Sequence, residues 1–262
     1  MTRNWQFVLA TDLDGTFLGG SEAHRAQLYR WIEANRESVG LIFVTGRDPS
    51  FIEGLCADTT VPWPDYVVGD VGTTIAEMVP VGPGGRVSPI PALEAEIAAI
   101  WNDAGPRVRA ALDGVAGLAL QPTSFRNRVS YDYDPDSFDR RAIAIVDGLA
   151  CDALISADCF FDVLPKGVSK GPSILRLIRH LGLVPDRVLV AGDTMNDHSM
   201  LVSPLPAVAV GGSEQPLLDA LPKRRDIYLA PGVGADGIMD AIGHFGLHPR
   251  PPKPGTPLKD AS

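Results

Sequence analysis

The chain has few cysteines and few histidines, with three and five in 262 residues. Cys56, Cys151 and Cys159 form no Cys-x-x-Cys pair and leave an odd count, which argues against a disulfide framework. No cluster of cysteine and histidine has the spacing of a zinc site. Reduced, mostly buried thiols in a cytoplasmic protein are therefore the simpler expectation.

Long apolar runs and an excess of positive charge are missing as well. No segment approaches the roughly 20 apolar residues that a transmembrane helix needs, and the N-terminus shows no secretory signal pattern. The net charge of −9 argues against nucleic acid or an anionic membrane as the main partner. We expect a globular protein, monomer or homodimer, that binds a small molecule.

Short apolar segments alternate with helical ones, which is typical of an α/β protein. Continuous apolar strands suit a parallel sheet that is buried on both faces. Strands are expected at 7–11, 41–45, 66–68, 187–191 and 207–210, and helices at 21–35, 51–57 and 172–181. The pattern predicts a doubly wound, mostly parallel, Rossmann-like core.

The middle of the chain departs from this pattern. A passage rich in proline and glycine, residues 80–91, predicts a hinge or linker. Beyond it, a helix and two strands are expected twice, at 92–101, 115–120, 128–133, 137–149, 153–156 and 160–164. This αββαββ order predicts an inserted α+β cap over residues 73–164, a core formed by 1–72 and 165–247, and a flexible tail over 248–262.

The most informative motif, Asp12-Leu13-Asp14-Gly15, follows the first expected strand. Side chains at i and i+2 of an extended segment point the same way, so Asp12 and Asp14 face one small volume. Two ionised carboxylates this close repel each other unless a cation or a proton intervenes. A polar turn after a strand would use the same residue types, so the rest of the chain has to decide between the two interpretations.

Other polar side chains lie at the ends of expected strands or helices, where open α/β sheets bind their ligands. They are Thr45, Gly46, Lys170, Asp193, Asn196 and Asp197. Carboxylate oxygens are the ligands that Mg²⁺ prefers, and a lysine and a hydroxyl can hold phosphoryl oxygens. The set predicts phosphoryl transfer, with one aspartate as the nucleophile and another moving the proton.

Four motifs, DLDGT, VTGR, SKG and GDTMND, occur in this order between residues 12 and 197 and resemble those of the haloacid dehalogenase-like phosphatase superfamily. The resemblance implies that Asp12 is the nucleophile and Asp14 the general acid/base. It also implies a phosphate site and a Mg²⁺ site. The phosphate site would use Thr45, Gly46, Lys170 and Asn196, and the Mg²⁺ site Asp12, the backbone carbonyl of Asp14, Asp193 and Asp197.

Three further stretches, PDYVVGDVGTTI, SFRNRVSY and DVLPKGVSKG, resemble sucrose-phosphate phosphatases and relatives that act on other glycosyl phosphates. The resemblance implies hydrolysis of a sugar phosphate under a closing cap. Candidate substrate contacts are Arg47, Arg126, Arg128 and Lys166, each of which could equally stabilise a loop or lie in solvent. GDTMND departs from the trehalose-phosphate phosphatase pattern, which usually carries an Asp-Asp pair there. Asp70 is interpreted as the end of a strand.

Two alternatives remain. A phosphomutase of the same superfamily, resembling phosphomannomutase, would return the phosphoryl group to the sugar. A catalytically silent relative would bind or regulate, and its expected mark is the loss of a motif residue, which this chain does not show. Ion pumps that form an aspartyl-phosphate carry threonine at the position of Asp14, and the chain has no apolar span of their kind.

Overall fold

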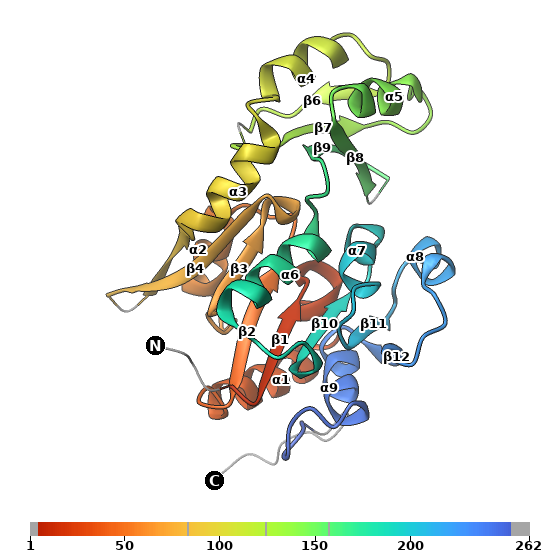
Figure 1. Cartoon of the computed structure of the whole chain (residues 1–262). Coiled ribbons are helices and arrows are strands. Elements are labelled where there is room, and N and C mark those ends of the chain that lie inside the picture. Colours follow the sequence, from red (N-terminus) through yellow and green to blue (C-terminus); the bar gives the residue numbers. More distant parts are fainter. Residues whose placement is uncertain (1–4, 83, 124, 157, 253–262) are drawn as a thin grey trace.

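A computed structural model describes residues 5–252 apart from 83, 124 and 157. Within these residues the chain forms an eight-stranded sheet in the order β12-β11-β10-β1-β2-β3-β4-β5 and a four-stranded sheet in the order β6-β7-β9-β8 (Figure 1). The expected α/β architecture is confirmed. No helix in this part of the chain is both long and apolar enough to cross a membrane.

The centre of the large sheet is parallel. β1 pairs with β2 on one side and with β10 on the other, and both faces of these strands are buried. The parallel strands are β1 (Phe7–Thr11), β2 (Val39–Val44), β3 (Tyr66–Gly69), β10 (Val188–Gly192), β11 (Ala207–Gly211) and β12 (Ile227–Val233). Their carboxyl ends meet at one edge, which is where such sheets place ligands.

Helices cover both faces of the large sheet, as a doubly wound fold requires. One face packs against α1 (Glu22–Ala34), α2 (Pro49–Asp58) and α9 (Ala235–His244). The other packs against α6 (Lys170–Leu181), α7 (His198–Leu201) and α8 (Gln215–Ala220). Two of these helices begin at side-chain caps, because Ser21 accepts from the backbone of α1 and Asp48 from that of α2.

The passage expected to be a hinge is instead a β-hairpin. β4 (Thr74–Val81) and β5 (Gly84–Pro89) pair antiparallel and extend the large sheet beyond β3. The linker prediction is wrong because β5 is an edge strand, where Pro89 costs no ladder hydrogen bond. Glycine also fits here, since a Cβ on Gly85 would come within 2.6 Å of the Met78 sulfur.

The smaller sheet follows this hairpin in the chain. Its strands are β6 (Leu118–Leu120), β7 (Val129–Tyr133), β8 (Cys151–Ser156) and β9 (Phe160–Pro165), all antiparallel. The helices are α3 (Pro91–Trp101), α4 (Gly105–Leu112) and α5 (Arg141–Gly148). The expected αββαββ order is present with α4 added, a short helix that the sequence analysis missed.

Because the hairpin belongs to the large sheet, the first expected cap boundary at residue 73 does not match the strand order. We propose a boundary near residue 90, and the cap denotes residues 91–165 from here on. Two residues of the expected flexible tail, 248–262, contact the core. His248 contacts Ser38, and the Trp31 indole donates to the Arg250 carbonyl, so these first tail residues pack on the core. Residues 253–262 lie outside the described part.

Candidate active site

Asp12 directly follows the buried strand β1, and the chain then turns sharply through Gly15. Gly15 has a φ of +82°, which favours glycine. A Cβ at this position would lie 2.1 Å from Oδ2 of Asp193. Glycine is therefore required at this position for two reasons. It tolerates the positive φ, and it leaves room where the Asp12 loop contacts Asp193.

Three carboxylates from two loops converge next to this turn. Ligand atoms of Asp12, Asp193 and Asp197 all lie within 4.8 Å of one another. Lys170, the first residue of α6, is completely buried beneath them. Its Nζ donates at 2.7 Å to Oδ1 of Asp12, to Oδ1 of Asp197 and to Oδ1 of Asn196. The structure thus brings together five residues that the sequence motifs had placed apart.

Burial changes the proton affinities of this cluster. Burial, reinforced by the charges of Asp197 and Asp193, raises the pKa of Asp12 to about 8 although Lys170 opposes it. Burial likewise raises the pKa of Asp193 to about 6, against the hydrogen bond from Thr16. Burial alone would lower the pKa of Lys170, but the charges of Asp12 and Asp197 outweigh it and raise that pKa. The cluster therefore holds more negative charge than Lys170 can balance.

A hard divalent cation fits this arrangement. Lys170 donates a hydrogen bond to Oδ1 of Asp12, and the Thr16 hydroxyl donates one to Oδ1 of Asp193 at 2.6 Å. The Oδ2 atoms of both aspartates are left for a metal. Both carboxylate oxygens of Asp197 already accept hydrogen bonds. Lys170 donates to one, and the backbone N–H groups of Asp193 and Thr194 donate to the other. The donor set suits Mg²⁺, with Asp197 better placed to support the site than to ligate directly.

Asp14 points away from the carboxylate cluster toward Arg47. The guanidinium donates from Nε to Oδ2 at 2.9 Å and from Nη2 to Oδ1 at 3.2 Å, and both side chains are about half exposed. Thr45 ends the neighbouring strand β2, and its hydroxyl oxygen accepts from the backbone N–H of Arg47. The two aspartates of the first motif thus have different surroundings, one buried on a lysine and one open to solvent.

A cleft of about 420 Å³ lies between the carboxyl edge of the large sheet and the cap. Its core side includes Asp12, Asp14, Thr45, Gly46, Arg47 and Asn196. Its cap side includes Gln121, Phe125, Arg128, Ser156, Phe160 and Asp162. This is the space in which a substrate could reach Asp12.

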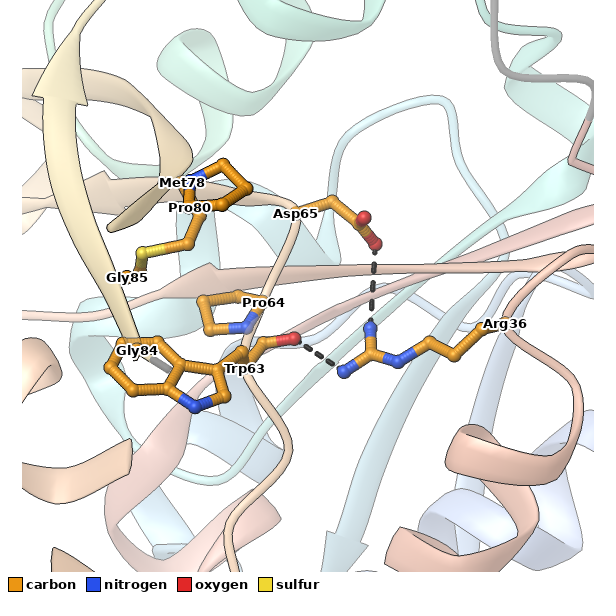
Figure 2. Close-up of a pocket in the computed structure, with 8 residues that line it drawn as sticks. All are labelled: Arg36, Trp63, Pro64, Asp65, Met78, Pro80, Gly84 and Gly85. Atoms are coloured by element: carbon orange, nitrogen blue, oxygen red, sulfur yellow. Dashed lines mark hydrogen bonds and ion pairs between the residues drawn. The ribbon is translucent and has the colours of Figure 1, made fainter. Parts of the chain in front are cut away.

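A second hollow, of about 270 Å³, lies elsewhere (Figure 2). Trp63, Met78 and Pro80 form its apolar wall, and Arg36 bonds the Trp63 carbonyl and Asp65 at its rim. Asp65 directly precedes β3, so this hollow is at the amino end of that strand and not at the carboxyl edge that carries the acidic cluster.

The structure places two of the four candidate substrate contacts in the cleft and two outside its lining. Arg47 and Arg128 line the cleft. Arg126 is half exposed, pairs with Glu94 at 2.7 Å and is not among the residues that line the cleft. Lys166 is directed to Asp147 and Asp152 and lines a different hollow on the cap, so the structure does not bring it to the site.

Asp70 directly follows β3, as expected, and it also contacts a residue of the cap. It is buried with a φ of +51°, accepts from the Thr74 hydroxyl, and lies 3.6 Å from Nη2 of Arg128. Arg128 also contacts Asp162 at 3.1 Å and donates to the Gly46 carbonyl at 3.3 Å. Cap and core are therefore joined through one buried arginine.

The sequence analysis missed Thr16, Asp162 and the aromatic residues on the cap side of the cleft. Asp162 carried a usable signal, because it interrupts the otherwise apolar strand β9, Phe-Phe-Asp-Val-Leu-Pro. An ionisable residue at a buried strand position needs a partner, and Arg128 supplies it. Thr16 and the aromatic residues gave no comparable signal.

Comparison with known proteins adds the family. The model of the family described as sucrose-6F-phosphate phosphohydrolase matches residues 5–246. The chain belongs to this family. Membership places it among the haloacid dehalogenase-like phosphatases, as the four motifs indicate.

Two curated relatives show how the family varies. The chain is 40% identical over 241 residues to the glucosylglycerol-phosphate synthase of Pseudomonas anguilliseptica, covering 92% of this chain but only 31% of that protein. It is 27% identical to the mannosylfructose-phosphate phosphatase of Agrobacterium fabrum, covering 93% of this chain and 98% of that protein. The chain thus spans about a third of the length of the first relative and nearly all of the second.

A solved structure of the same family shows the same fold. The sucrose-phosphatase of Synechocystis sp. PCC6803, determined with sucrose and phosphate, superposes with a TM-score of 0.80. The match covers 92% of this chain and 98% of that one at 24% sequence identity. At this identity the likeness establishes the fold of the sucrose-6F-phosphate phosphohydrolase family, core and cap together, and not the substrate.

Proposed function

We propose that this protein is a Mg²⁺-dependent phosphomonoesterase that hydrolyses a sugar phosphate through an aspartyl-phosphate. The observation that carries the proposal is the convergence of Asp12, Asp193 and Asp197 on the buried Lys170 at the floor of the cleft. Carboxylates surrounding a lysine at the end of parallel strands can hold a cation and a phosphoryl group side by side.

The reaction takes place in two steps. An oxygen of the Asp12 carboxylate attacks phosphorus, the bond to the sugar oxygen breaks, and Asp14 gives its proton to that oxygen. Asp14 then takes a proton from water, whose oxygen attacks phosphorus and releases Asp12 and inorganic phosphate. When bound, Mg²⁺ supplies positive charge that offsets the negative charge of the phosphoryl group and the carboxylates.

The chain's own residues orient the phosphate. Thr45 and Gly46 lie at the end of β2 beside Asp12, and Asn196 comes from the loop that also carries Asp193. Lys170 lies below Asp12 and is already bonded to three side-chain oxygens, so its main effects are to hold the nucleophile in place and to oppose the rise of its pKa on burial. Asp14 must leave Arg47 to meet the leaving oxygen.

The substrate class follows from what the relatives share. Their names refer to glucosylglycerol phosphate, mannosylfructose phosphate and sucrose phosphate. Each is a hexose joined through a glycosidic bond to a second polyhydroxylated unit. We propose that this protein removes phosphate from such a phosphorylated glycoside.

Phosphate release from a panel of hexose phosphates and glycoside phosphates, with and without Mg²⁺, tests the proposal. We expect release without any bisphosphate activator, which separates a phosphatase from the phosphomutase alternative. Asp12→Asn should abolish turnover while its thermal melting curve keeps one transition. Substantial phosphatase activity in that variant, or equal activity in excess chelator, would refute the mechanism.

A further inference from the structure

The two cations in the described lining of the cleft are already paired. Arg47 makes two hydrogen bonds to Asp14. Arg128 contacts Asp162 and Asp70. Burial raises the pKa of both carboxyl groups, and the positive charge of Arg128 opposes that rise. These guanidinium groups face carboxylates, so their positive charge is balanced in this structure.

Apart from the Arg128–Asp162 pair, the cap side of the cleft is uncharged and includes two aromatic rings. Phe160, the first residue of β9, is 42% exposed. It is the only one of the markedly exposed large apolar side chains, among the described residues, that lines the cleft. Phe160 therefore presents to the cleft an apolar surface that a ligand bound there would cover.

Polar groups flank this ring on both sides. In the sheet register Phe160 lies opposite Ser156 of β8 and opposite Asp132 of β7. Gln121 donates its amide N–H to Asp132 at 2.9 Å, which leaves its amide oxygen available. Cross-strand neighbours share one face of a sheet, so hydroxyl and amide groups border the aromatic surface. Phe125 adds a second ring, stacked 3.6 Å from the Arg128 guanidinium carbon.

We infer that Phe160 determines specificity by packing against the C–H face of an uncharged, polyhydroxylated leaving group. The inference rests on the proposed function and narrows its substrate to monophosphates. A sugar ring has C–H bonds on its face and hydroxyl groups at its edge. Its face can pack on the exposed Phe160 ring while its hydroxyl groups meet Ser156 and Gln121. The described lining of the cleft holds four aspartates, Asp12, Asp14, Asp48 and Asp162, against two arginines, so a second phosphate would be repelled.

Phe160→Ala tests the contact, with Leu120→Ala as the matched control. Leu120 is 52% exposed on β6 of the same sheet, opposite the buried Tyr131, and does not line the cleft. Substrates are sucrose 6-phosphate and the ring-free ester glycerol 3-phosphate. We expect Phe160→Ala to raise KM for the glycoside phosphate about tenfold with kcat within about twofold, a loss of uniform binding. Its kinetics on glycerol 3-phosphate should not change, and Leu120→Ala should match the unaltered protein on both.

Conservative replacement and charge complete the test. Phe160→Tyr should restore KM, because it keeps the aromatic surface. Fructose 1,6-bisphosphate should have a kcat/KM at least about tenfold below that of fructose 6-phosphate. Equal KM values for the glycoside in Phe160→Ala and the unaltered protein, or a preference for the bisphosphate, would overturn the inference while the phosphatase proposal stands. Absence of phosphate release from every monophosphate would overturn the proposed function itself.

Discussion

Arg128 of the cap lies between Asp162 on the neighbouring cap strand and Asp70 of the core. Its contacts are 3.1 Å to Asp162 and 3.6 Å to Asp70, and all three side chains are buried. The same guanidinium donates to the carbonyl of Gly46, in the loop that we assign to the phosphate. One cap residue thus fixes the distance between the cap and the loop on which the chemistry depends.

Removing this arginine should destabilise the protein strongly. Arg128→Ala leaves two buried carboxylates without a positively charged partner, so the free energy of unfolding should fall by about 3–5 kcal/mol. Arg141→Ala is the control, because Arg141 is exposed on the cap and solvent screens its pair with Asp139, so its loss should change the free energy of unfolding little. Urea unfolding of both variants checks this. Equal destabilisation in the two would show that Arg128 does not hold cap and core together.

Gly15 should not tolerate a side chain. Gly15→Ala would place a Cβ against Oδ2 of Asp193 at a positive φ, so the two loops must separate. We expect Mg²⁺ affinity and activity to fall at least about tenfold, as when the support of a metal ligand is lost. Gly54→Ala is the control, because Gly54 lies in α2 with open space around it and should gain about 0.5–1 kcal/mol of stability. Full activity in Gly15→Ala would contradict the close approach.

The core of the site was predictable from the sequence for a physical reason. Asp12, Thr45 and Asp193 each follow a continuous apolar strand, and parallel strands end at one edge of the sheet. Local pattern and ordered motifs were therefore enough to predict their convergence. The ligand roles assigned to these residues remain predictions.

The contacts between cap and core were not predictable in the same way. Arg128 and Asp70 are 58 residues apart on different sheets, so no local period links them. The hairpin of β4 and β5 was missed because Pro80 and Pro89 indicate a break. Pro89 lies on the edge strand β5, and Pro80 lies beyond the part of β4 that pairs with β3, so both are accepted. Lys166 was predicted near the site because it is close in sequence to Lys170. Lys166 follows the cap strand β9, however, whereas Lys170 begins α6 of the core.

Asp14 should govern proton transfer and not binding. Asp14→Asn removes the carboxyl group that gives and takes the proton, so kcat should fall by about 10²–10⁴ with little change in KM. With p-nitrophenyl phosphate, whose leaving group needs no proton, a burst of nitrophenol equal to the enzyme should precede slow turnover. Asp48→Asn, in the same cleft, should cost less than about tenfold because asparagine also caps α2. A wild-type kcat in Asp14→Asn would exclude this role.

Mg²⁺ affinity should rise with pH. Burial raises the pKa of Asp193 to about 6 and that of Asp12 to about 8, so the metal-free protein retains protons that Mg²⁺ must displace. From Asp193 alone, binding should be about tenfold weaker at pH 5 than at pH 7. Calorimetry in two buffers of different ionisation enthalpy should report proton release on binding at pH 7.

The raised pKa values of Asp12 and Asp193 also determine how the stability of the metal-free protein changes with pH. The folded protein binds more protons than the unfolded chain between about pH 4 and pH 8, so the free energy of unfolding falls as pH rises through this range. Saturating Mg²⁺ favours the ionised carboxylates and should remove much of that fall. Melting temperatures at pH 5 and pH 8, with Mg²⁺ and with chelator, measure both effects. A Mg²⁺-induced rise that is no larger at pH 8 than at pH 5 would show that the metal does not bind these carboxylates.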